Sequence, residues 1–316
     1  MAPPEHDVVV FNHLPKAAGT SVRDSLVSAL KPARSVAYLD LAMVAGGADF
    51  ETLDPRAREQ FVFDPQELPD ADFVTGHISP GTTMARYPHG RHVTVLRNPQ
   101  TRVISQWVHS RSLTDLDLRH WGTGDVFRAA RWPLKRYLSH AKIAPNVDNT
   151  MTRFLTWPHP LLPADDFIAD TADDELFDKA VRTLDAMVHV DVVENRNFIT
   201  DLGAALGVEL TTTRLNDRSL FPPVVPTDLA SELDEETRAV LDHRTRIDLR
   251  IWRHVAERVL PGTDLDALLA ADLDDSIQRY SQLPAGRPTG RLVRRAGIVA
   301  YRLKARFDPK LREYRS

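Results

Sequence analysis

The sequence predicts an α/β fold in which helices cover both faces of a central, mainly parallel sheet. Short apolar, β-branched runs alternate along the chain with longer segments whose apolar residues recur at helical spacing. This alternation favours parallel pairing, because each crossover between parallel strands places a helix on a face of the sheet. The chain has 316 residues, 42% of them hydrophobic, which is enough for a large buried core. We therefore expect three layers.

Four strands are expected from short runs rich in β-branched and aromatic residues. The second run stops at Gly76-His77, and the third leads directly into Arg97. Strand ends of this kind place polar side chains at the edge of a sheet. The four runs cover residues 8–11, 72–75, 92–96 and 188–193.

Helices are predicted between and after these strands. Either Thr20 or Ser21 can cap the first helix, and Pro99 occupies the favoured first position of another. Residues 40–70 also look helical but irregular, because glycines and prolines interrupt them. Apolar spacing predicts helices over 20–30, 99–112, 125–140, 147–157, 165–184, 194–206 and 228–259.

Composition excludes several classes of protein. The chain has no cysteine, which rules out disulfide scaffolds, thiol catalysis and cysteine-ligated metal sites. A formal net charge of -4 argues against a nucleic-acid partner that covers the whole surface. No apolar run approaches the roughly 20 residues of a membrane span, and the N-terminus lacks a signal-peptide pattern. We therefore expect a cytoplasmic location.

The charge is unevenly distributed along the chain. Residues 286–316 hold ten bases and two acids, a net +8, while the remaining residues carry -12. Apolar residues recur there at helical spacing, so we divide the chain into a domain over 1–265 and an extension over 266–316 with a basic amphipathic helix. Two interpretations stay open: the helix docks on the acidic body, or residues 287–312 contact an anionic acceptor or the inner membrane face.

The loop at residues 13–21 has the composition of a phosphate site. It joins a predicted strand to a predicted helix, where backbone N–H groups and the helix dipole bind anions. Gly19 allows close backbone approach, Lys16 supplies a point charge, and the hydroxyls of Thr20 and Ser21 can donate to phosphate oxygens. The lysine precedes the glycine, so the G-x-x-x-x-G-K-[ST] pattern of magnesium-dependent nucleotide triphosphatases is absent. A capped turn that binds nothing is the alternative.

Residues 11–21, with the sequence FNHLPKAAGTS, resemble the 5′-phosphosulfate loop of sulfotransferases that use 3′-phosphoadenosine 5′-phosphosulfate (PAPS). The similarity is to the branch that includes the heparan 2-O-sulfotransferases and related bacterial enzymes. One hydroxyl is lost, because Ala17 stands where threonine is usual, but its amide remains. The resemblance implies a P-loop-like three-layer fold. It assigns donor binding to Lys16, Ala17, Ala18, Gly19, Thr20 and Ser21.

A second segment, TVLRNPQTRVIS at residues 94–105, is similar to the element that holds the 3′-phosphate of PAPS. The resemblance assigns that phosphate to Arg97 at a strand end and to Ser105 about two helical turns later. The planar guanidinium fork suits such a ligand, because it can bind phosphate through two hydrogen bonds. A looser match at residues 214–218 adds Arg218 to the donor site.

The strand FVTGH at residues 73–77 resembles the one whose histidine removes the proton of the acceptor hydroxyl. Histidine suits that role because its pKa lies near neutrality. The resemblance therefore makes His77 the catalytic base, although a lone histidine at a strand end is more often structural. His13 and His109 remain rivals that could act as the base or line the acceptor site.

Residues 148–155, DNTMTRFL, resemble a segment that bacterial members write as D-N-x-Q-T-R-x-L. Met151 replaces the glutamine, and we expect it to pack in the core. The resemblance implies acceptor-side roles for Asn149 and Arg153.

Together these segments imply sulfuryl transfer from PAPS to a hydroxyl of a carbohydrate, glycolipid or secondary metabolite, with adenosine 3′,5′-bisphosphate (PAP) as the product. His77 would be the general base, and Lys16 would stabilise charge on the leaving phosphate. No metal is required. The alternatives are a nucleotide-dependent phosphotransferase and a non-catalytic relative that binds PAPS or PAP.

Overall fold

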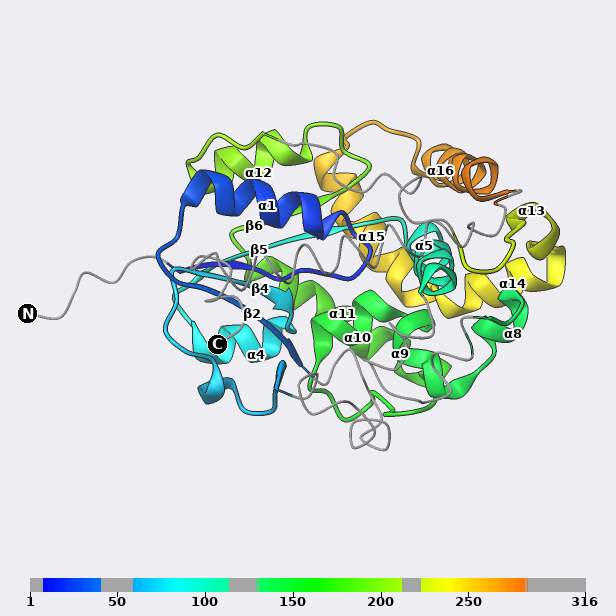
Figure 1. The fold of residues 1–316 in the computed structure, drawn as a ribbon, viewed down its shortest axis with the longest axis horizontal. Coiled ribbons are helices and arrows are strands. Elements are labelled where there is room, and N and C mark those ends of the chain that lie inside the picture. The colour runs from blue at the N-terminus through cyan, green and yellow to red at the C-terminus, as the bar shows by residue number, and fades with distance from the viewer. Residues whose placement is uncertain are drawn as a thin grey trace, which may run out of the picture.

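The computed structural model describes residues 8–40, 59–113, 129, 131–211, 223–281 and 283. Within them, six strands form one sheet in the order β3-β2-β4-β1-β5-β6, and every pairing is parallel. Helices flank this sheet on both faces, which confirms the predicted α/β class (Figure 1). The strands are β1 (Val9–Phe11), β2 (Ser35–Asp40), β3 (Phe61–Val62), β4 (Phe73–His77), β5 (Arg91–Leu96) and β6 (His189–Val192).

All four predicted strands are present, as β1, β4, β5 and β6. The sequence did not predict β2 and β3 at the other edge of the sheet. The irregular helix expected over 40–70 is wrong for residues 59–70, which form β3 and a 3-10 turn at Pro65–Glu67. The residues of β2 do not form one continuous apolar run, and the strand is defined instead by its pairing with β3 and β4.

The described helices keep the predicted order, and those expected over 147–157, 165–184 and 194–206 are shorter than predicted. Residues 125–128 and 130 of the helix expected over 125–140 lie outside the described residues. The stretch predicted over 228–259 is three helices, and Asp234 caps the second of them by accepting a hydrogen bond from the Thr237 amide at 2.8 Å. The helices are α1 (Gly19–Leu30), α4 (Pro80–Arg86), α5 (Pro99–Ser112), α8 (Leu134–Leu138), α9 (Ala144–Val147), α10 (Thr150–Thr156), α11 (Asp173–Asp185), α12 (Phe198–Leu206), α13 (Leu229–Glu232), α14 (Glu235–Arg244), α15 (Arg246–Val259) and α16 (Leu265–Tyr280).

Apolar side chains alternate between the two faces of the central strands. Phe11 and Phe73 face α1 and α12, where they pack with Leu26 and Leu202. The other face of the same strands lies against the α4 region, where Val10 is buried. Helices α10, α11 and α15 enclose the far end of the sheet at β6. The sheet is therefore the middle of three layers (Figure 1).

Helix α16 is part of this body. Leu269 is buried in the core that α10, α11 and α15 share, and Tyr280 is buried against α5 and α13. The predicted domain division after residue 265 therefore falls in the first turn of a packed helix. The basic segment 287–312 lies outside the described residues. Among the helices that the structure describes, none has the length and apolar character to cross a membrane.

Candidate functional site

Three neighbouring strands bring the sequence-predicted site residues to one edge of the sheet. β1 lies between β4 and β5, and all three are parallel, so their carboxyl ends meet at the same edge. The loop with Lys16 follows β1, His77 ends β4, and Arg97 follows β5. The chain leaves β1 towards β2 on one side and leaves β5 towards β6 on the other. Such a switch of direction is where open α/β sheets bind ligands.

The loop after β1 has an unusual backbone. Lys16 and Ala18 adopt left-handed conformations, with φ of 68° and 57°. These conformations cost a non-glycine residue about 1–3 kcal/mol each, and they cluster at functional sites. A left-handed residue next to the right-handed start of a helix directs consecutive N–H groups to one side, which forms an anion-binding concavity. Ala18 and Gly19 have this arrangement.

Helix α1 begins without a side-chain cap. Ala18 is the N-cap residue, so the prediction that Thr20 or Ser21 caps the helix is wrong. Both hydroxyl residues lie in the first turn instead, and that turn holds no acidic residue. The N–H groups of Gly19 and Thr20 precede the first intrahelical bond, which the Ser21 amide donates to Ala18 at 3.1 Å. The helix start can therefore accept a phosphate.

Gly19 is required by its neighbour His13. A Cβ atom on Gly19 would lie 1.6 Å from Nε2 of His13, so the imidazole occupies the space that any other residue would need. The ring of His13 also stacks on Phe11, with centroids 5.5 Å apart, and contacts the ring of His77 at 4.5 Å. His13 is thus packed between the loop and the predicted base.

The protonation of His77 follows from its hydrogen bond. Its Nδ1 lies 2.8 Å from the carbonyl oxygen of His13, and a carbonyl can only accept. Nδ1 therefore carries the proton, and Nε2 of the neutral ring carries a lone pair.

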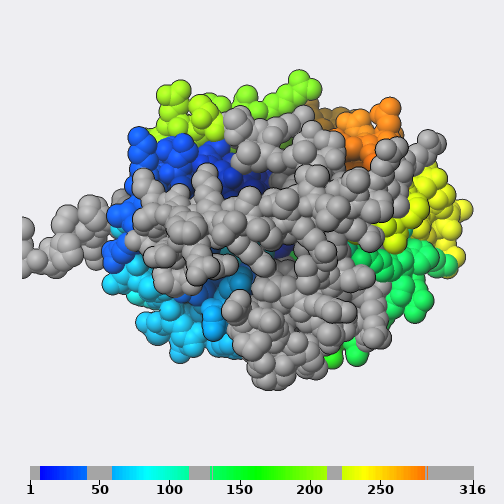
Figure 2. All heavy atoms as spheres, viewed as in Figure 1, coloured from blue at the N-terminus to red at the C-terminus, as the bar shows by residue number. Residues whose placement is uncertain are grey.

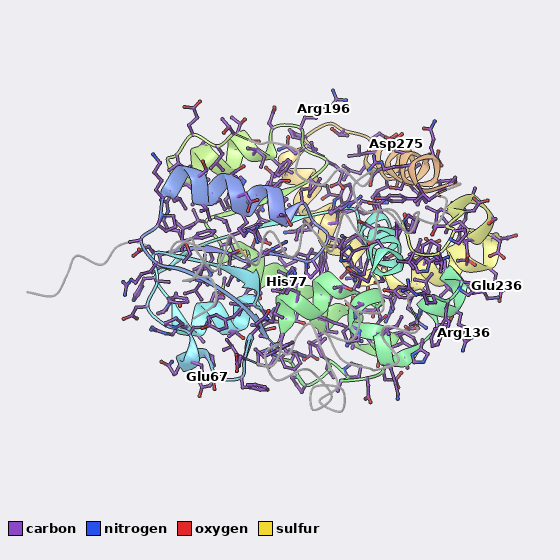
Figure 3. All side chains as sticks on the ribbon, viewed as in Figure 1. Glu67, His77, Arg136, Arg196, Glu236 and Asp275 are labelled. Atoms are coloured by element: carbon purple, nitrogen blue, oxygen red, sulfur yellow. The ribbon has the colours of Figure 1, made fainter. Side chains whose placement is uncertain are left out.

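The residue that precedes His77 must be glycine. Gly76 has a φ of 109°, and a Cβ atom at this position would lie 2.2 Å from the backbone oxygen of Tyr38. Figure 3 shows His77 near the middle of the molecule.

The surroundings keep both histidines neutral. Burial lowers the pKa of His77 below its usual value, and the charges of Lys16 and Arg23 lower it further, against the opposing effect of the hydrogen bond to His13. Burial, with the neighbouring His77 and the same two cations, lowers the pKa of His13 still more. An unprotonated imidazole near neutral pH can act as a general base.

Arg97 joins the end of β5 to the loop after β1. Its Nη1 donates to the carbonyl oxygen of Lys16 at 3.2 Å, and its Nε donates to the hydroxyl of Thr101 at 3.2 Å. Within the described part of the chain, Arg97 has no carboxylate partner and Nη2 has no hydrogen bond. Ser105 lies two turns further along α5 and is only 2% exposed. Arg97 is therefore the accessible member of the predicted 3′-phosphate pair.

His109 is not at this edge of the sheet. His109 is exposed near the C-terminal end of α5, about 15 Å along the helix axis from Pro99. The structure therefore does not place His109 beside His77. Arg218 lies outside the described residues.

Asn149 and Arg153 have structural roles, which corrects their predicted acceptor-side roles. Arg153 is 2% exposed, and its Nη2 pairs with Oδ2 of Asp148 at 2.9 Å. Its other donors bind the carbonyl oxygens of Asp148 and Pro163. Asn149 is fully buried and accepts the amide of Ile247 at 2.9 Å. The adjacent Met151 packs in the core, as predicted.

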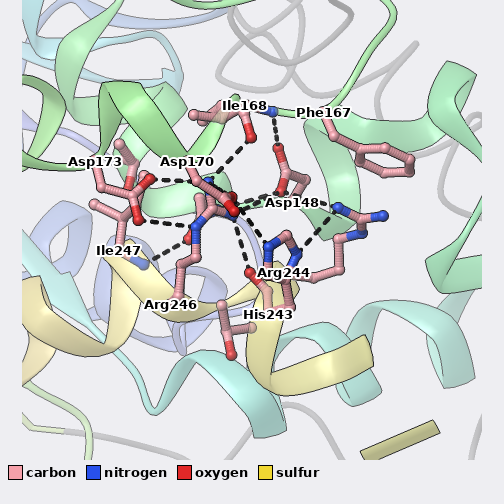
Figure 4. A network of polar contacts seen from close by, with 12 residues as sticks. Asp148, Phe167, Ile168, Asp170, Asp173, His243, Arg244, Arg246 and Ile247 are labelled. Carbon is pink, nitrogen blue, oxygen red and sulfur yellow. Dashed lines mark hydrogen bonds and ion pairs between the residues drawn. The ribbon is translucent and has the colours of Figure 1, made fainter. Parts of the chain in front are cut away.

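Arg153 pairs with Asp148, and Asp148 lies in a wider network of polar contacts with Arg246 and Ile168 (Figure 4). The carboxylate of Asp148 also accepts the amide of Ile168 at 2.8 Å. Arg246 approaches Asp148 at 3.9 Å and pairs with Asp173 at 2.8 Å. Because every arginine here faces a carboxylate, the network joins α10, α11 and α15 and leaves no net cation for a ligand.

Sequence analysis missed Arg23 as a neighbour of the site. Arg23 lies one turn after Gly19 on α1, and its charge reaches both histidines. In this structure its Nε and Nη2 bind Oδ1 of Asp24, at 2.8 and 2.6 Å. The four-residue spacing from Gly19 on a predicted helix was the signal that could have identified it.

The described residues contain no group of three or more histidines and carboxylates placed to hold a metal ion. Comparison with protein-family models and with curated proteins gives no match to the sequence. The resemblance to sulfotransferases therefore rests on the motifs of the chain.

Proposed function

We propose that the protein is a sulfotransferase that moves a sulfuryl group from PAPS to a hydroxyl acceptor. The observation that carries this proposal is the position of three independent motifs. The loop with Lys16, the histidine His77 and the arginine Arg97 come from segments up to 81 residues apart, yet they follow three adjacent parallel strands. At that edge Arg97 also contacts the loop directly, since its Nη1 donates to the Lys16 carbonyl oxygen at 3.2 Å, so the three motifs can act on one ligand.

The residues at this edge fit an anionic nucleotide. The N–H groups of Gly19 and Thr20 and the charge of Lys16 would hold the 5′-phosphosulfate, and Arg97 would bind the 3′-phosphate through Nη2. PAPS supplies the sulfuryl group and leaves as PAP. Contributions from Ser105 and Arg218 remain predictions.

His77 would act on the acceptor. Its Nε2 removes the proton of the acceptor hydroxyl while that oxygen forms a bond to sulfur and the bond from sulfur to the 5′-phosphate oxygen breaks. The hydrogen bond from Nδ1 to the His13 carbonyl fixes the ring and places the lone pair on Nε2. Lys16 stabilises the charge that develops on the leaving phosphate.

The acceptor is a hydroxyl compound of a class still to be identified. Carbohydrate, glycolipid and secondary metabolite are the classes that the resemblance suggests. A shared fold does not establish a shared substrate, so these three classes are hypotheses about the acceptor. We further propose a cytoplasmic location and a membrane contact through residues 287–312.

The proposal can be tested by incubating the protein with PAPS and a metabolite extract. We expect mass spectrometry to detect a compound that gains one sulfuryl group, together with an equal amount of PAP. The His77→Ala variant provides the background. A product that gains a phosphoryl group from ATP and magnesium would support the phosphotransferase alternative. PAP binding without any sulfated product would support the non-catalytic alternative.

A further inference from the structure

Helix α16 reaches the predicted 3′-phosphate site through a chain of two hydrogen bonds. The hydroxyl of Thr101 lies 2.7 Å from Oδ2 of Asp272, which is on α16. Nε of Arg97 donates to the same hydroxyl at 3.2 Å. The Asn98 carbonyl oxygen lies farther from this hydroxyl, at 3.3 Å, so Thr101 gives its single proton to the carboxylate of Asp272 and accepts the proton of Arg97. The direction of both bonds is thereby determined.

The corner between β5 and α5 is held from several sides. Thr101 is fully buried at the start of α5. The amide of Asn98 donates to the buried carboxylate of Glu194 at 2.8 Å, and Nε1 of Trp252 donates to the same carboxylate at 3.0 Å. Leu269 packs α16 into the core beside this corner. Asp272 therefore acts from a helix whose position is itself fixed.

We propose that Asp272, acting through Thr101, positions the guanidinium of Arg97 for the 3′-phosphate of the donor nucleotide. This proposal rests on the proposed function. Arg97 is held at Nε by Thr101 and at Nη1 by Lys16, and Nη2 makes no hydrogen bond to the rest of the described chain, so it can bind the ligand. A side chain held in this way loses less conformational entropy when the phosphate binds.

The intervening hydroxyl has a second consequence. A direct ion pair between Arg97 and Asp272 would occupy the guanidinium edge and compete with phosphate. Thr101 separates the charges of Arg97 and Asp272, and its hydroxyl, which Asp272 holds in place, fixes the orientation of the Arg97 guanidinium. Helix α16 begins at Leu265, the predicted domain boundary, so the start of the C-terminal extension contributes to the nucleotide site.

The test compares two ligands that differ only in the 3′-phosphate, PAP and adenosine 5′-monophosphate (AMP). The dissociation constants of both are measured by calorimetry on the full chain. We expect Thr101→Val and Asp272→Ala to reduce the preference for PAP over AMP by about tenfold, or about 1.4 kcal/mol, with AMP affinity unchanged. A purely structural role would alter both affinities together.

Conservative variants separate positioning from folding. Thr101→Ser keeps the hydroxyl and Asp272→Asn keeps an acceptor oxygen, so both should retain the preference of the wild-type protein. Asp275→Asn is the matched control, because Asp275 is exposed on the same helix, at the periphery in Figure 3.

The surface of the molecule also shows α16 and the phosphate-loop helix together. In the space-filling view, α16 (orange) and α1 (blue) are both visible on the same face (Figure 2).

Two results would overturn the inference. One is an unchanged preference for PAP in folded Thr101→Val. The other is a loss of the preference for PAP over AMP in Thr101→Val while Asp272→Ala keeps it in full. That result would show that α16 does not contribute to binding of the 3′-phosphate. A wild-type protein that does not distinguish PAP from AMP would instead contradict the proposed function on which the inference rests.

Discussion

Two charged regions of this molecule look alike in the sequence and differ in the structure. One is the edge where β4, β1 and β5 end, and the other is the network around Asp148. Both contain arginine beside polar residues in a motif-like pattern. In the network, Arg153 pairs with Asp148 and Arg246 pairs with Asp173. At the strand ends, Arg97 has no carboxylate partner among the described residues.

This difference shows how to separate a structural cluster from a candidate site. A buried ion pair neutralises its own charge and joins elements of the fold. The strand-end region instead places the charges of Lys16 and Arg23 near two histidines and so disfavours protonation of their rings, beside a strained backbone at Lys16 and Ala18. Strained backbone and histidines with shifted pKa values cluster at functional sites, so the strand-end region is the candidate site.

The largest expected effect distinguishes chemistry from binding at the strand ends. His77→Ala should lower turnover roughly 10²–10⁴-fold, because the general base is removed. PAP affinity should remain near that of the wild-type protein. Rates of PAP formation and calorimetric dissociation constants measure the two effects, and His89→Ala, on an exposed turn, is the control. Full activity in His77→Ala would eliminate this histidine as the base.

The next effect belongs to the network. Asp148→Ala removes the partner of the buried Arg153 and should reduce the free energy of unfolding by about 3–5 kcal/mol. Urea denaturation measures this loss, and Asp178→Ala, on the exposed side of α11, should be nearly neutral. The folded fraction should keep its preference for PAP over AMP. A variant that loses this preference at unchanged stability would place the network in the donor site.

A smaller effect concerns the packing of the loop. Gly19→Ala places a Cβ within 1.6 Å of Nε2 of His13, so the ring must move, at a cost of about 1–3 kcal/mol. In the double variant with His13→Ala, the space is vacated and most of this cost should disappear. A double-mutant cycle of unfolding free energies gives the coupling between the two residues. Purely additive effects would contradict the packing described for His13.

The smallest effect is on pH dependence. The base must be unprotonated, and the pKa of His77 is lowered below 6.5, mainly by burial. The midpoint of the acidic limb of the activity profile should therefore lie below pH 6.5, where His77 gains its proton. Arg23→Gln removes one of the lesser causes, so the acidic limb should move slightly upward. An acidic limb above pH 6.5 in the wild-type protein would contradict the assigned environment.

The parts of the fold that the sequence predicts well are locally determined. β1, β4 and β5 are apolar runs ended by polar or glycine residues, and Pro99 marks the start of α5 at the predicted position. Lys16, His77 and Arg97 follow these strand ends, so their convergence was predictable once the sheet was parallel. β2 was missed because its burial depends on its neighbours in the sheet and not on its own pattern.

Contacts between residues far apart in the sequence explain why the roles of Asn149, Arg153 and Asp272 were not predicted. The burial of Asn149 depends on Ile247, 98 residues away, and that of Arg153 depends on a turn near Pro163. The bond between Thr101 and Asp272 spans 171 residues. Such pairings arise only when the helices pack, so neither spacing nor composition could reveal them.

The most direct test of the account needs no acceptor. Calorimetry on the full chain compares PAP, AMP and ATP with magnesium. We expect PAP to bind without a divalent cation and more tightly than the other two, and Arg97→Ala to lose the preference for PAP over AMP. Tighter binding of ATP with magnesium, or no measurable binding of PAP, would contradict the account.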